Sequence, residues 1–486
     1  MGTAVEKLAA TLSLPRLAST GRAARGLLNG TLEGSLRKRS LVASGLALFV
    51  TVLLYLLPDV HPLLQNADSA VYNDQVDARN LQSRTTHWGY MMLGVFARTL
   101  LPGPTDSVMN FMTLSAGALG IVACFTAAHR ATNALIPSVI ASLTLLTVPA
   151  YLRGMVLSEV DVPLTVFLSA SFALALLRKP VFSGLSFGAA LVISPLAGLT
   201  LAGILVVIVP EADGKLRVRG ALKRLTLFGV ASFAMYAPVV LANWQDYVYG
   251  GRGILHASRK NFDVVTRVHR SAEFLYRQCG PLLLLWGLGF IVGLRRRRYV
   301  IVFAPVVGLL VATLLGERLI DVPVQLPTIA LMVPLCALAL GALWRGRGQI
   351  VVSAIACSVV LAGIWRGFES THSLLEAQMA RMIAERDAYI ALAESSRRAP
   401  LLVNIKGYDQ GRRVERMVFG SAHPEHALSR KAFQRRCKRL ASARGHFIWF
   451  VASPHRLPCA ELEASYQVQS RTLNGRRFKV LIPRTG

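Results

Sequence analysis

Long apolar stretches separated by short polar segments dominate the chain between residues 41 and 365. A bilayer core about 30 Å thick needs about 20 apolar residues per helix, so this pattern predicts an all-α polytopic membrane protein with about 11 transmembrane helices. One neighbouring pair, 181–194 and 195–209, is short and divided at Ser194-Pro195, and a single long kinked helix is the alternative there. The expected spans are residues 41–58, 108–128, 133–150, 160–177, 181–194, 195–209, 222–242, 280–294, 299–316, 324–344 and 349–365.

Clusters of basic residues lie at the ends of alternate spans and predict the topology. Cytoplasmic loops carry an excess of Lys and Arg, so the pattern places the N-terminus in the cytoplasm, in what we expect to be a bacterial inner (plasma) membrane. The clusters that end the even-numbered spans are His129-Arg130, Arg178-Lys179, Lys215 to Arg224, Arg295 to Arg298 and Arg345 to Arg347.

This topology divides the chain into three parts. Residues 1–39 form a cytoplasmic basic tail, residues 40–365 form the transmembrane module, and residues 366–486 form an extracytoplasmic domain. Loops 59–107 and 243–279 also fall outside the cytoplasm, and function is expected on that side. Within the first loop, the apolar stretch from His87 to Leu101 is too short to span and predicts a helix lying at the interface.

The sequence pattern of the C-terminal region predicts a small α/β or α+β domain. It begins with a stretch of helical periodicity, Ser373 to Ser396, and continues with strand-like runs. Two cysteines, Cys437 and Cys459, lie here, and outside the cytoplasm they can form a disulfide, although their spacing does not establish the pairing. The strand-like runs are Pro400 to Ile405, His446 to Ala452 and Phe478 to Ile482.

Composition and charge exclude several classes of protein. Hydrophobic residues make up 53% of the 486 and the 39 glycines add about 8%, so the apolar share is about 61%, whereas a soluble domain has about 45–50% on that count. The same apolar content excludes intrinsic disorder. The chain has 54 Lys and Arg against 26 Asp and Glu, a net charge of +28, but the basic residues sit in clusters between apolar runs. That distribution favours a membrane protein over a nucleic-acid-binding one.

Two acidic clusters are candidates for chemistry at the extracytoplasmic surface of the membrane. The first holds Asp68 and is followed by His87, and the alternative is that its acids only cap a surface helix. The second is Glu159-Val160-Asp161, shortly after Arg153, where ionisable groups at a helix end normally face a cavity or partner. A favourable interaction with the helix dipole is the simpler explanation of that cluster. Two carboxylates alone are a weak metal signal.

A third cluster is basic and precedes the eighth span. Its side chains can bind a lipid-linked phosphate through charge-assisted hydrogen bonds. They can equally lie against anionic headgroups, and the sequence does not separate the two readings. The cluster comprises Arg252, His256, Arg259, Lys260, Arg267, His269 and Arg270.

Taken in order, these motifs resemble the GT-C superfamily of integral-membrane glycosyltransferases, in particular the branch similar to protein O-mannosyltransferases. The matching motifs are Asp68-Ser69, His87-Trp88-Gly89-Tyr90, Leu100-Leu101-Pro102 and Glu159-Val160, the last opening the fourth span. The chain departs from the branch where His-Trp-Gly-Tyr replaces a proline-rich His-Pro-Pro-Gly-Tyr type pattern. The resemblance covers roughly residues 41–210.

The resemblance implies an inverting glycosyltransferase with a polyprenyl-phosphate sugar as donor and a glycan, lipid or protein hydroxyl as acceptor. Asp68 is then the catalytic base. We expect no other cofactor and a metal-free reaction, although Glu159-x-Asp161 leaves room for a divalent ion. The alternatives are a ligase using a lipid-diphosphate oligosaccharide, a secondary transporter and an inactive scaffold. We expect His87, Tyr90, Arg153, Glu159 and Asp161 to bind substrate, and Arg252, His256, Arg259 and Lys260 to bind the lipid phosphate.

Overall fold

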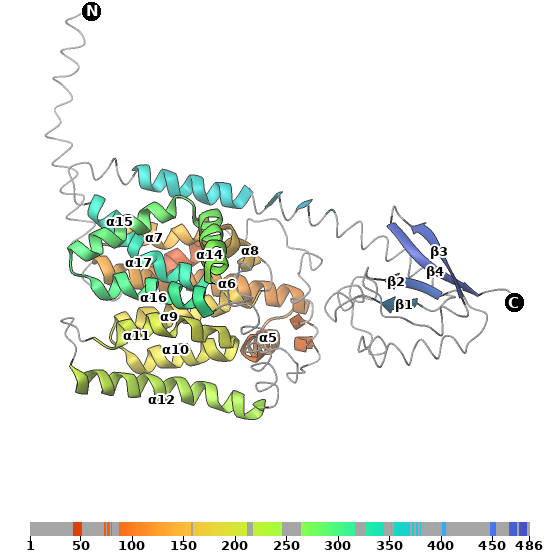
Figure 1. The fold of residues 1–486 in the computed structure, drawn as a ribbon, viewed down its shortest axis with the longest axis horizontal. Coiled ribbons are helices and arrows are strands. Elements are labelled where there is room, and N and C mark those ends of the chain that lie inside the picture. The colour runs from red at the N-terminus through yellow and green to blue at the C-terminus, as the bar shows by residue number, and fades with distance from the viewer. Residues whose placement is uncertain are drawn as a thin grey trace, which may run out of the picture.

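The structure is a computed structural model of the chain, in which apolar helices form one bundle and four strands form a small sheet (Figure 1). It describes residues 42–50, 72–73, 75–77, 79, 87–156, 159–210, 217–244, 264–315, 326–344, 351, 354–369, 372–373, 376–377, 380, 401–404, 448–452, 466–473 and 476–483.

Each span predicted between residues 108 and 344 corresponds to a helix or to a helix with a short 3₁₀ segment. Residues 42–50 and 354–369, within or overlapping the first and last predicted spans, are helical as well. The helical elements are α5 (Trp88–Leu100), α6 (Thr105–Thr132), α7 (Leu135–Leu143), η2 (Thr144–Thr147), α8 (Pro149–Val156), α9 (Asp161–Leu176), α10 (Pro180–Ile193), η3 (Pro195–Thr200), α11 (Leu201–Ile208), α12 (Val218–Ala242), α14 (Val264–Cys279), α15 (Leu282–Arg295), α16 (Tyr299–Leu315) and α17 (Leu326–Leu343).

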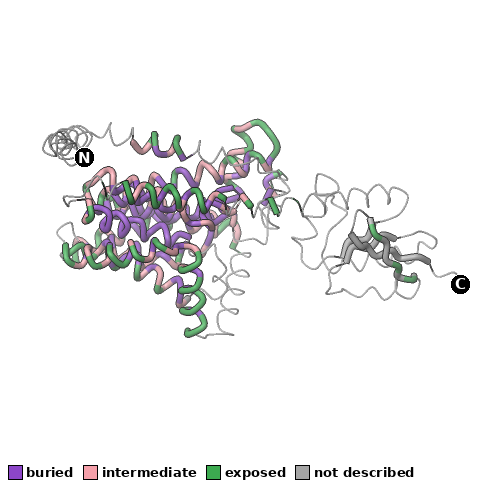
Figure 2. Tube along the Cα trace, turned by 90° about the horizontal axis from the view of Figure 1, so that it is seen from above, coloured by how far each residue is buried: buried purple, intermediate pink, exposed green. Residues whose placement is uncertain are grey.

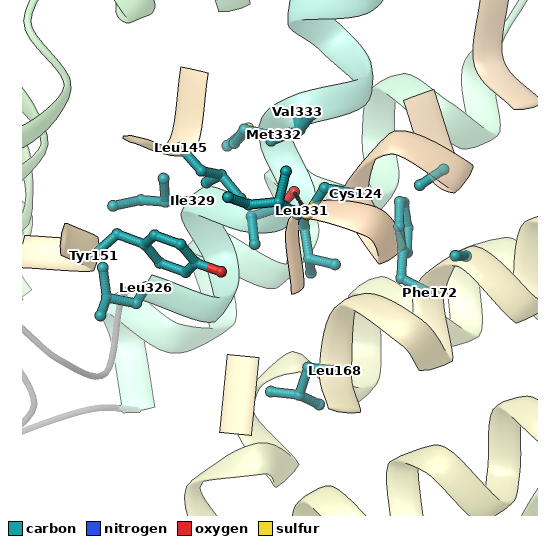
Figure 3. Packing of buried hydrophobic residues seen from close by; sticks show 14 of the residues in the cluster. Cys124, Leu145, Tyr151, Leu168, Phe172, Leu326, Ile329, Leu331, Met332 and Val333 are labelled. Carbon is teal, nitrogen blue, oxygen red and sulfur yellow. Dashed lines mark hydrogen bonds between the residues drawn. The ribbon is translucent and has the colours of Figure 1, made fainter. Parts of the chain in front are cut away.

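Helix α17 forms the centre of the bundle, and 89% of its length is buried. It packs against α6, α7, α9, α15 and α16. Figure 3 shows part of this core, where residues of α17 from Leu326 to Val333 pack together with Leu145, Tyr151, Cys124 and Phe172. The Tyr151 hydroxyl donates to the Gly117 carbonyl at 2.9 Å, so that this buried polar group is satisfied within the core.

Helices α9, α10 and α12 pack through small residues that let their backbones approach closely. Ser171 on α9 donates to the Ser183 carbonyl on α10 at 2.9 Å, and Ser186 donates to Phe167 O at 2.8 Å. On the other side of α10, Gly184 lies directly against the Phe228 carbonyl of α12. Small residues and interhelical hydrogen bonds are the usual means of helix packing in lipid, where apolar area alone gives little driving force.

The segment divided at Ser194-Pro195 forms two antiparallel helices rather than one kinked helix. The Arg178 guanidinium, beside the start of α10, donates to Val207 O at 2.9 Å and Pro210 O at 2.5 Å at the end of α11. Arg224, near the start of α12, donates to Ile208 O and Val209 O at 2.9 and 2.7 Å. Two of the predicted cytoplasmic basic clusters therefore meet at the C-terminal end of α11, where cations stabilise the helix dipole.

The lengths and surfaces of the helices are those of an integral membrane protein. Three helices, α6, α12 and α17, are long and apolar enough to cross a bilayer singly. Two bent pairs also qualify if each counts as one span: α7–η2 with α8, bent by 74°, and α14 with α15, bent by 105°. Exposed residues lie along the outer sides of the bundle, and α12 is only 17% buried (Figure 2). The total of 11 crossings stays a prediction.

The C-terminal strands form one mixed sheet in the order β1-β2-β4-β3. Strands β1 and β2 are parallel, with Leu402 opposite Phe450, while β4 is antiparallel to both β2 and β3. The three predicted strand runs correspond to β1 (Leu401–Asn404), β2 (Ile448–Ala452) and β4 (Arg476–Pro483), whereas β3 (Tyr466–Leu473) was not singled out from the sequence. The two cysteines of this region lie outside the described residues.

Candidate active site at one end of the bundle

The predicted His-Trp-Gly-Tyr motif docks at the break between α10 and η3. His87 precedes α5, and its Nδ1 donates to the Ile193 carbonyl at 3.2 Å. Gly89 lies against the same backbone, because a Cβ there would sit 2.8 Å from Ile193 N. The motif thus places α5 at the end of α10, and Figure 1 shows α5 there nearly end-on while α10 runs across the view.

The hydrogen bond to Ile193 fixes the tautomer of His87. A carbonyl only accepts, so Nδ1 carries the hydrogen and Nε2 keeps its lone pair when the ring is neutral. Burial lowers the pKa of His87 below its ordinary value of 6.5, and the hydrogen bond to Ile193 offsets part of that effect. His87 is therefore a neutral imidazole near pH 7, and Nε2 is the acceptor nitrogen of its ring.

Tyr72 joins the predicted first loop to this motif. Its ring meets the rings of His87 and Tyr90 edge to face, with centroids 5.8 and 5.3 Å apart. Tyr90 is fully buried and its hydroxyl lies 3.2 Å from Thr113 Oγ1, which itself donates to Met109 O. Tyr90 therefore lies beneath Tyr72 and is anchored to α6.

Further polar contacts hold the described residues of the first loop against α6. The buried Asn73 donates to Asp106 Oδ1 at 2.5 Å, in the first turn of that helix. Thr105 donates to the carboxylate of Asp77 and accepts from Arg98 Nε at 3.1 Å. The acidic residue at the helix start also benefits from the positive end of the helix dipole.

Arg153 lies on α8, and this helix packs against the acidic cluster and the start of α9. Glu159 lies against α8, since a Cβ on Gly154 would be 3.4 Å from Glu159 Oε2. Asp161 is 8% exposed and opens α9. Among the described residues, Arg153 Nε is buried and has no hydrogen-bond partner. A buried donor left unpaired costs about 1–3 kcal/mol, which a bound acceptor would relieve.

The antiparallel packing of α9 on α10 brings these two groups to the same end of the bundle. Ser171 pairs with Ser183, and Phe167 with Ser186, one helical turn further on. At the same spacing, Ile193 at the end of α10 lies level with Asp161 at the start of α9. Ile193 is the hydrogen-bond partner of His87. Arg178 and Arg224 lie at the opposite end. The candidate residues that the structure describes therefore gather at the end that the charge pattern assigns to the extracytoplasmic side.

Part of the loop predicted at 243–279 is a helix, α14, which is attached at both of its ends. Arg267 is 3% exposed and donates from Nη1 to Leu314 O at 2.6 Å, at the C-terminal end of α16. At the other end, Gln278 Oε1 accepts from the Ala150 amide of α8 at 2.9 Å. The sequence placed Arg267 in the basic cluster, and in the structure it binds the end of a helix.

The remaining candidates lie outside the described residues. Within the described residues, no group of three or more metal-ligating side chains occurs. Sequence reasoning missed Tyr72 and Gln278, because neither belongs to a motif and both act through contacts distant in sequence. The undescribed candidates are Asp68, Arg252, His256, Arg259 and Lys260.

No family model matches the chain and no curated protein matches its sequence, but solved structures share its fold. ArnT from Cupriavidus metallidurans, bound to undecaprenyl phosphate, superposes with a TM-score of 0.59 at 14% identity, covering 93% of this chain and 99% of ArnT. An Archaeoglobus fulgidus oligosaccharyltransferase in complex with Zn and sulfate gives 0.55 at 14% identity, covering 91% and 74%. Both are GT-C superfamily glycosyltransferases.

The chain has the GT-C fold. This confirms the fold predicted from the motif order, and the likeness extends over nearly the whole length of ArnT. At 14% identity the likeness establishes the architecture.

Proposed function

We propose that the chain is an inverting glycosyltransferase that moves a sugar from a polyprenyl-phosphate donor to an acceptor hydroxyl at the extracytoplasmic membrane face. The observation that carries the proposal is the gathering of His87, Arg153, Glu159 and Asp161 at one end of a GT-C bundle. These residues come from separate segments, and their position at the same end of the bundle supports a shared site. The likeness to an enzyme crystallised with undecaprenyl phosphate supports the class of donor.

A single displacement accounts for the small number of acids. The acceptor oxygen forms a bond to the anomeric carbon as the bond from that carbon to the phosphate oxygen breaks. A carboxylate takes the hydroxyl proton, and the polyprenyl phosphate leaves as a stable anion that needs no protonation. Glycosidases, which expel a poor leaving oxygen, need a second carboxyl group as acid. We assign the base to Asp68.

The cations are proposed to stabilise the departing phosphate. Arg252, His256, Arg259 and Lys260 are assigned to the lipid phosphate, and Arg153 to substrate, a role that its buried Nε without a partner supports. Glu159 and Asp161 are assigned to orienting the sugar or the acceptor. His87 is assigned to donor binding through Nε2, and Tyr90 to holding the aromatic group beneath the site.

The proposal is tested in a strain that lacks the gene. Cell-envelope glycans and lipid-linked sugars are analysed in that strain and in strains carrying the wild-type chain, Asp68→Asn or the surface control Glu273→Gln, whose carboxylate pairs with Arg277. In the strain lacking the gene and in the strain carrying Asp68→Asn, we expect one sugar to disappear from the glycans and its polyprenyl-phosphate donor to accumulate. The strains carrying the wild-type chain or Glu273→Gln should show neither change. Unchanged glycans together with altered transport of a solute would refute the proposal in favour of a transporter.

A ligase that uses a lipid-diphosphate oligosaccharide is the second candidate, which the likeness to an oligosaccharyltransferase favours. The same analysis separates the two enzymes, because loss of a ligase would cause a diphosphate-linked oligosaccharide to accumulate in place of a monophosphate-linked sugar. Binding of undecaprenyl phosphate to purified Arg259→Ala tests the phosphate site directly. We expect weaker binding, and unchanged affinity would remove Arg259 from that site.

A further inference from the structure

Helix α8 begins with a backbone amide that its own segment does not satisfy. Pro149 at its first position has no N–H group. The amides of Tyr151 and Leu152 both donate to Val148 O, at 3.0 and 3.2 Å. The remaining amide of this turn belongs to Ala150, a residue that is 5% exposed, and it donates to the side chain of Gln278, 128 residues away along the chain. Gln278 therefore supplies the N-terminal cap of α8 from a distant helix.

The rest of α8 is held by the core. Tyr151 donates to Gly117 O of α6, and Met155 fills the space over Gly117 so closely that a Cβ there would clash with it. Arg153 lies on the same helix but is half-buried, and Glu159 contacts α8 at the adjacent Gly154. The helix that carries Arg153 is thus held by the core at Tyr151 and Met155, and by Gln278 at its first turn.

Helix α14, which carries Gln278, begins immediately after the segment that bears Arg252, His256, Arg259 and Lys260. Its first turns are attached to the end of α16 through Arg267, and its last turn is attached to α8 through Gln278. Helix α14 therefore connects the end of α16 to the start of α8, the helix that carries Arg153.

We propose that Gln278 is a positioning residue, which fixes the start of α8 and thereby holds in place the helix that carries Arg153 and lies against Glu159 at Gly154. This inference rests on the proposed function for its catalytic consequence. Its structural part, the attachment of α8 by Gln278, stands independently.

Amide hydrogen exchange of the full-length protein in lipid nanodiscs tests the attachment without any substrate. The variants are Gln278→Leu, which removes the acceptor, Gln278→Glu, which keeps an acceptor oxygen, and Arg277→Gln, the exposed neighbour. We expect exchange in peptides covering α8 to be about fivefold faster in Gln278→Leu alone, because one hydrogen bond is lost. Unchanged α8 exchange in Gln278→Leu would overturn the inference, whatever the enzyme does.

A double-mutant cycle with Arg153→Gln tests the catalytic consequence. The assay uses saturating polyprenyl-phosphate donor extracted from the strain lacking the gene. We expect Gln278→Leu to lower the transfer rate about tenfold and to change the affinity for undecaprenyl phosphate by less than about twofold. The variant Gln278→Glu should keep a transfer rate close to that of the wild type. In the Arg153→Gln background, Gln278→Leu should have no further effect. Additive losses would show that Gln278 does not act through Arg153. If the wild-type chain transfers no sugar, the proposed function fails, and the exchange measurement still decides the attachment.

Discussion

At the scale of single residues, His87 combines a fixed tautomer with a lowered pKa. The folded protein holds the ring neutral, because burial opposes its charge and Nδ1 is bonded to Ile193 O. In the unfolded chain the ring takes up a proton at its ordinary pKa of 6.5. The stability that neutral His87 contributes is thus complete above that pH and is lost as the pH falls towards the folded pKa.

We therefore predict that the thermal unfolding midpoint of the purified wild-type protein falls as the pH drops below about 6.5. The fall should be less steep in His87→Asn, because asparagine keeps a donor near the position of Nδ1 but does not titrate. Measuring the midpoint between about pH 8 and pH 5 checks this. His269→Asn, at an exposed position on α14, should follow the wild-type curve. Parallel curves for wild type and His87→Asn would contradict the prediction.

Gly89 gives a steric prediction for the same motif. A Cβ at this position would lie 2.8 Å from backbone atoms of Val192 and Ile193, so Gly89→Ala must push α5 away from α10. Overpacking of this kind costs about 1–3 kcal/mol. We expect a lower unfolding midpoint and reduced transfer, whereas Gly198→Ala, with open space around its Cβ, should leave both near wild type. Equal behaviour of the two variants would refute the close approach.

How far the candidate site could be predicted follows from these contacts. The motif containing His87 was identified from local sequence, because its residue types and order are a local signal. Its partner is a backbone carbonyl at Ile193, and no side-chain pattern encodes a carbonyl. Tyr72 and Gln278 were missed for the same reason: their roles depend on how helices distant in sequence are packed.

At the scale of secondary-structure elements, two helices end with arginine in the left-handed conformation. Arg178 has φ 61° and Arg297 has φ 56°, and each follows a helix closed by the hydrogen bonds of a Schellman motif, a position that glycine normally occupies. Both arginines incur a cost of about 1–2 kcal/mol relative to glycine. Arg178 offsets it by two hydrogen bonds to the end of α11, and Arg297 is exposed.

The two positions therefore form a matched pair. We predict that Arg297→Gly slightly raises the unfolding midpoint, because it relieves the backbone cost without removing a described contact. Arg178→Gly should lower the midpoint, since charge-assisted hydrogen bonds are worth about 1.5–3 kcal/mol each. Thermal unfolding of both variants in detergent checks the difference. A stabilising Arg178→Gly would show that the contacts with α11 contribute little.

Packing of α10 on α12 gives a second element-level prediction. Gly184→Ala places a methyl group against the Phe228 carbonyl and should separate the two helices, lowering the midpoint. Gly229→Ala on α12 meets open space and should be neutral or stabilising by up to about 1 kcal/mol, because alanine favours helix. Comparing the two unfolding midpoints checks this prediction, and equal midpoints would contradict it.

The helices themselves were largely predictable, because long apolar runs must be helical in a bilayer. The bends after η2 and after α14 were not, since they depend on where α8 and α14 dock rather than on hydropathy. The same applies to α14 as a whole: its charged residues indicated a loop, while its buried face only becomes apparent once α8 and α16 are in place.

At the scale of the whole molecule, the two ends of the bundle differ in charge and in the candidate residues they carry, and this difference predicts an orientation that can be measured. In a cysteine-free background, Lys179→Cys lies at the end predicted to be cytoplasmic and Thr99→Cys lies on α5 at the other, and both positions are exposed. We predict that a membrane-impermeant maleimide labels Thr99→Cys in intact spheroplasts, and Lys179→Cys only after the membrane is broken. The reverse pattern would invert the topology.

The central position of α17 has a consequence for biogenesis. The helix that packs against α6, α7 and α9 is among the last of the described helices to be synthesised. Until it leaves the ribosome, those earlier helices must wait in the membrane with their shared inner surface incomplete, open to lipid or to an insertase. A chain truncated before residue 326 would lack the partner that those helices share, and membrane quality-control proteases would be expected to degrade it.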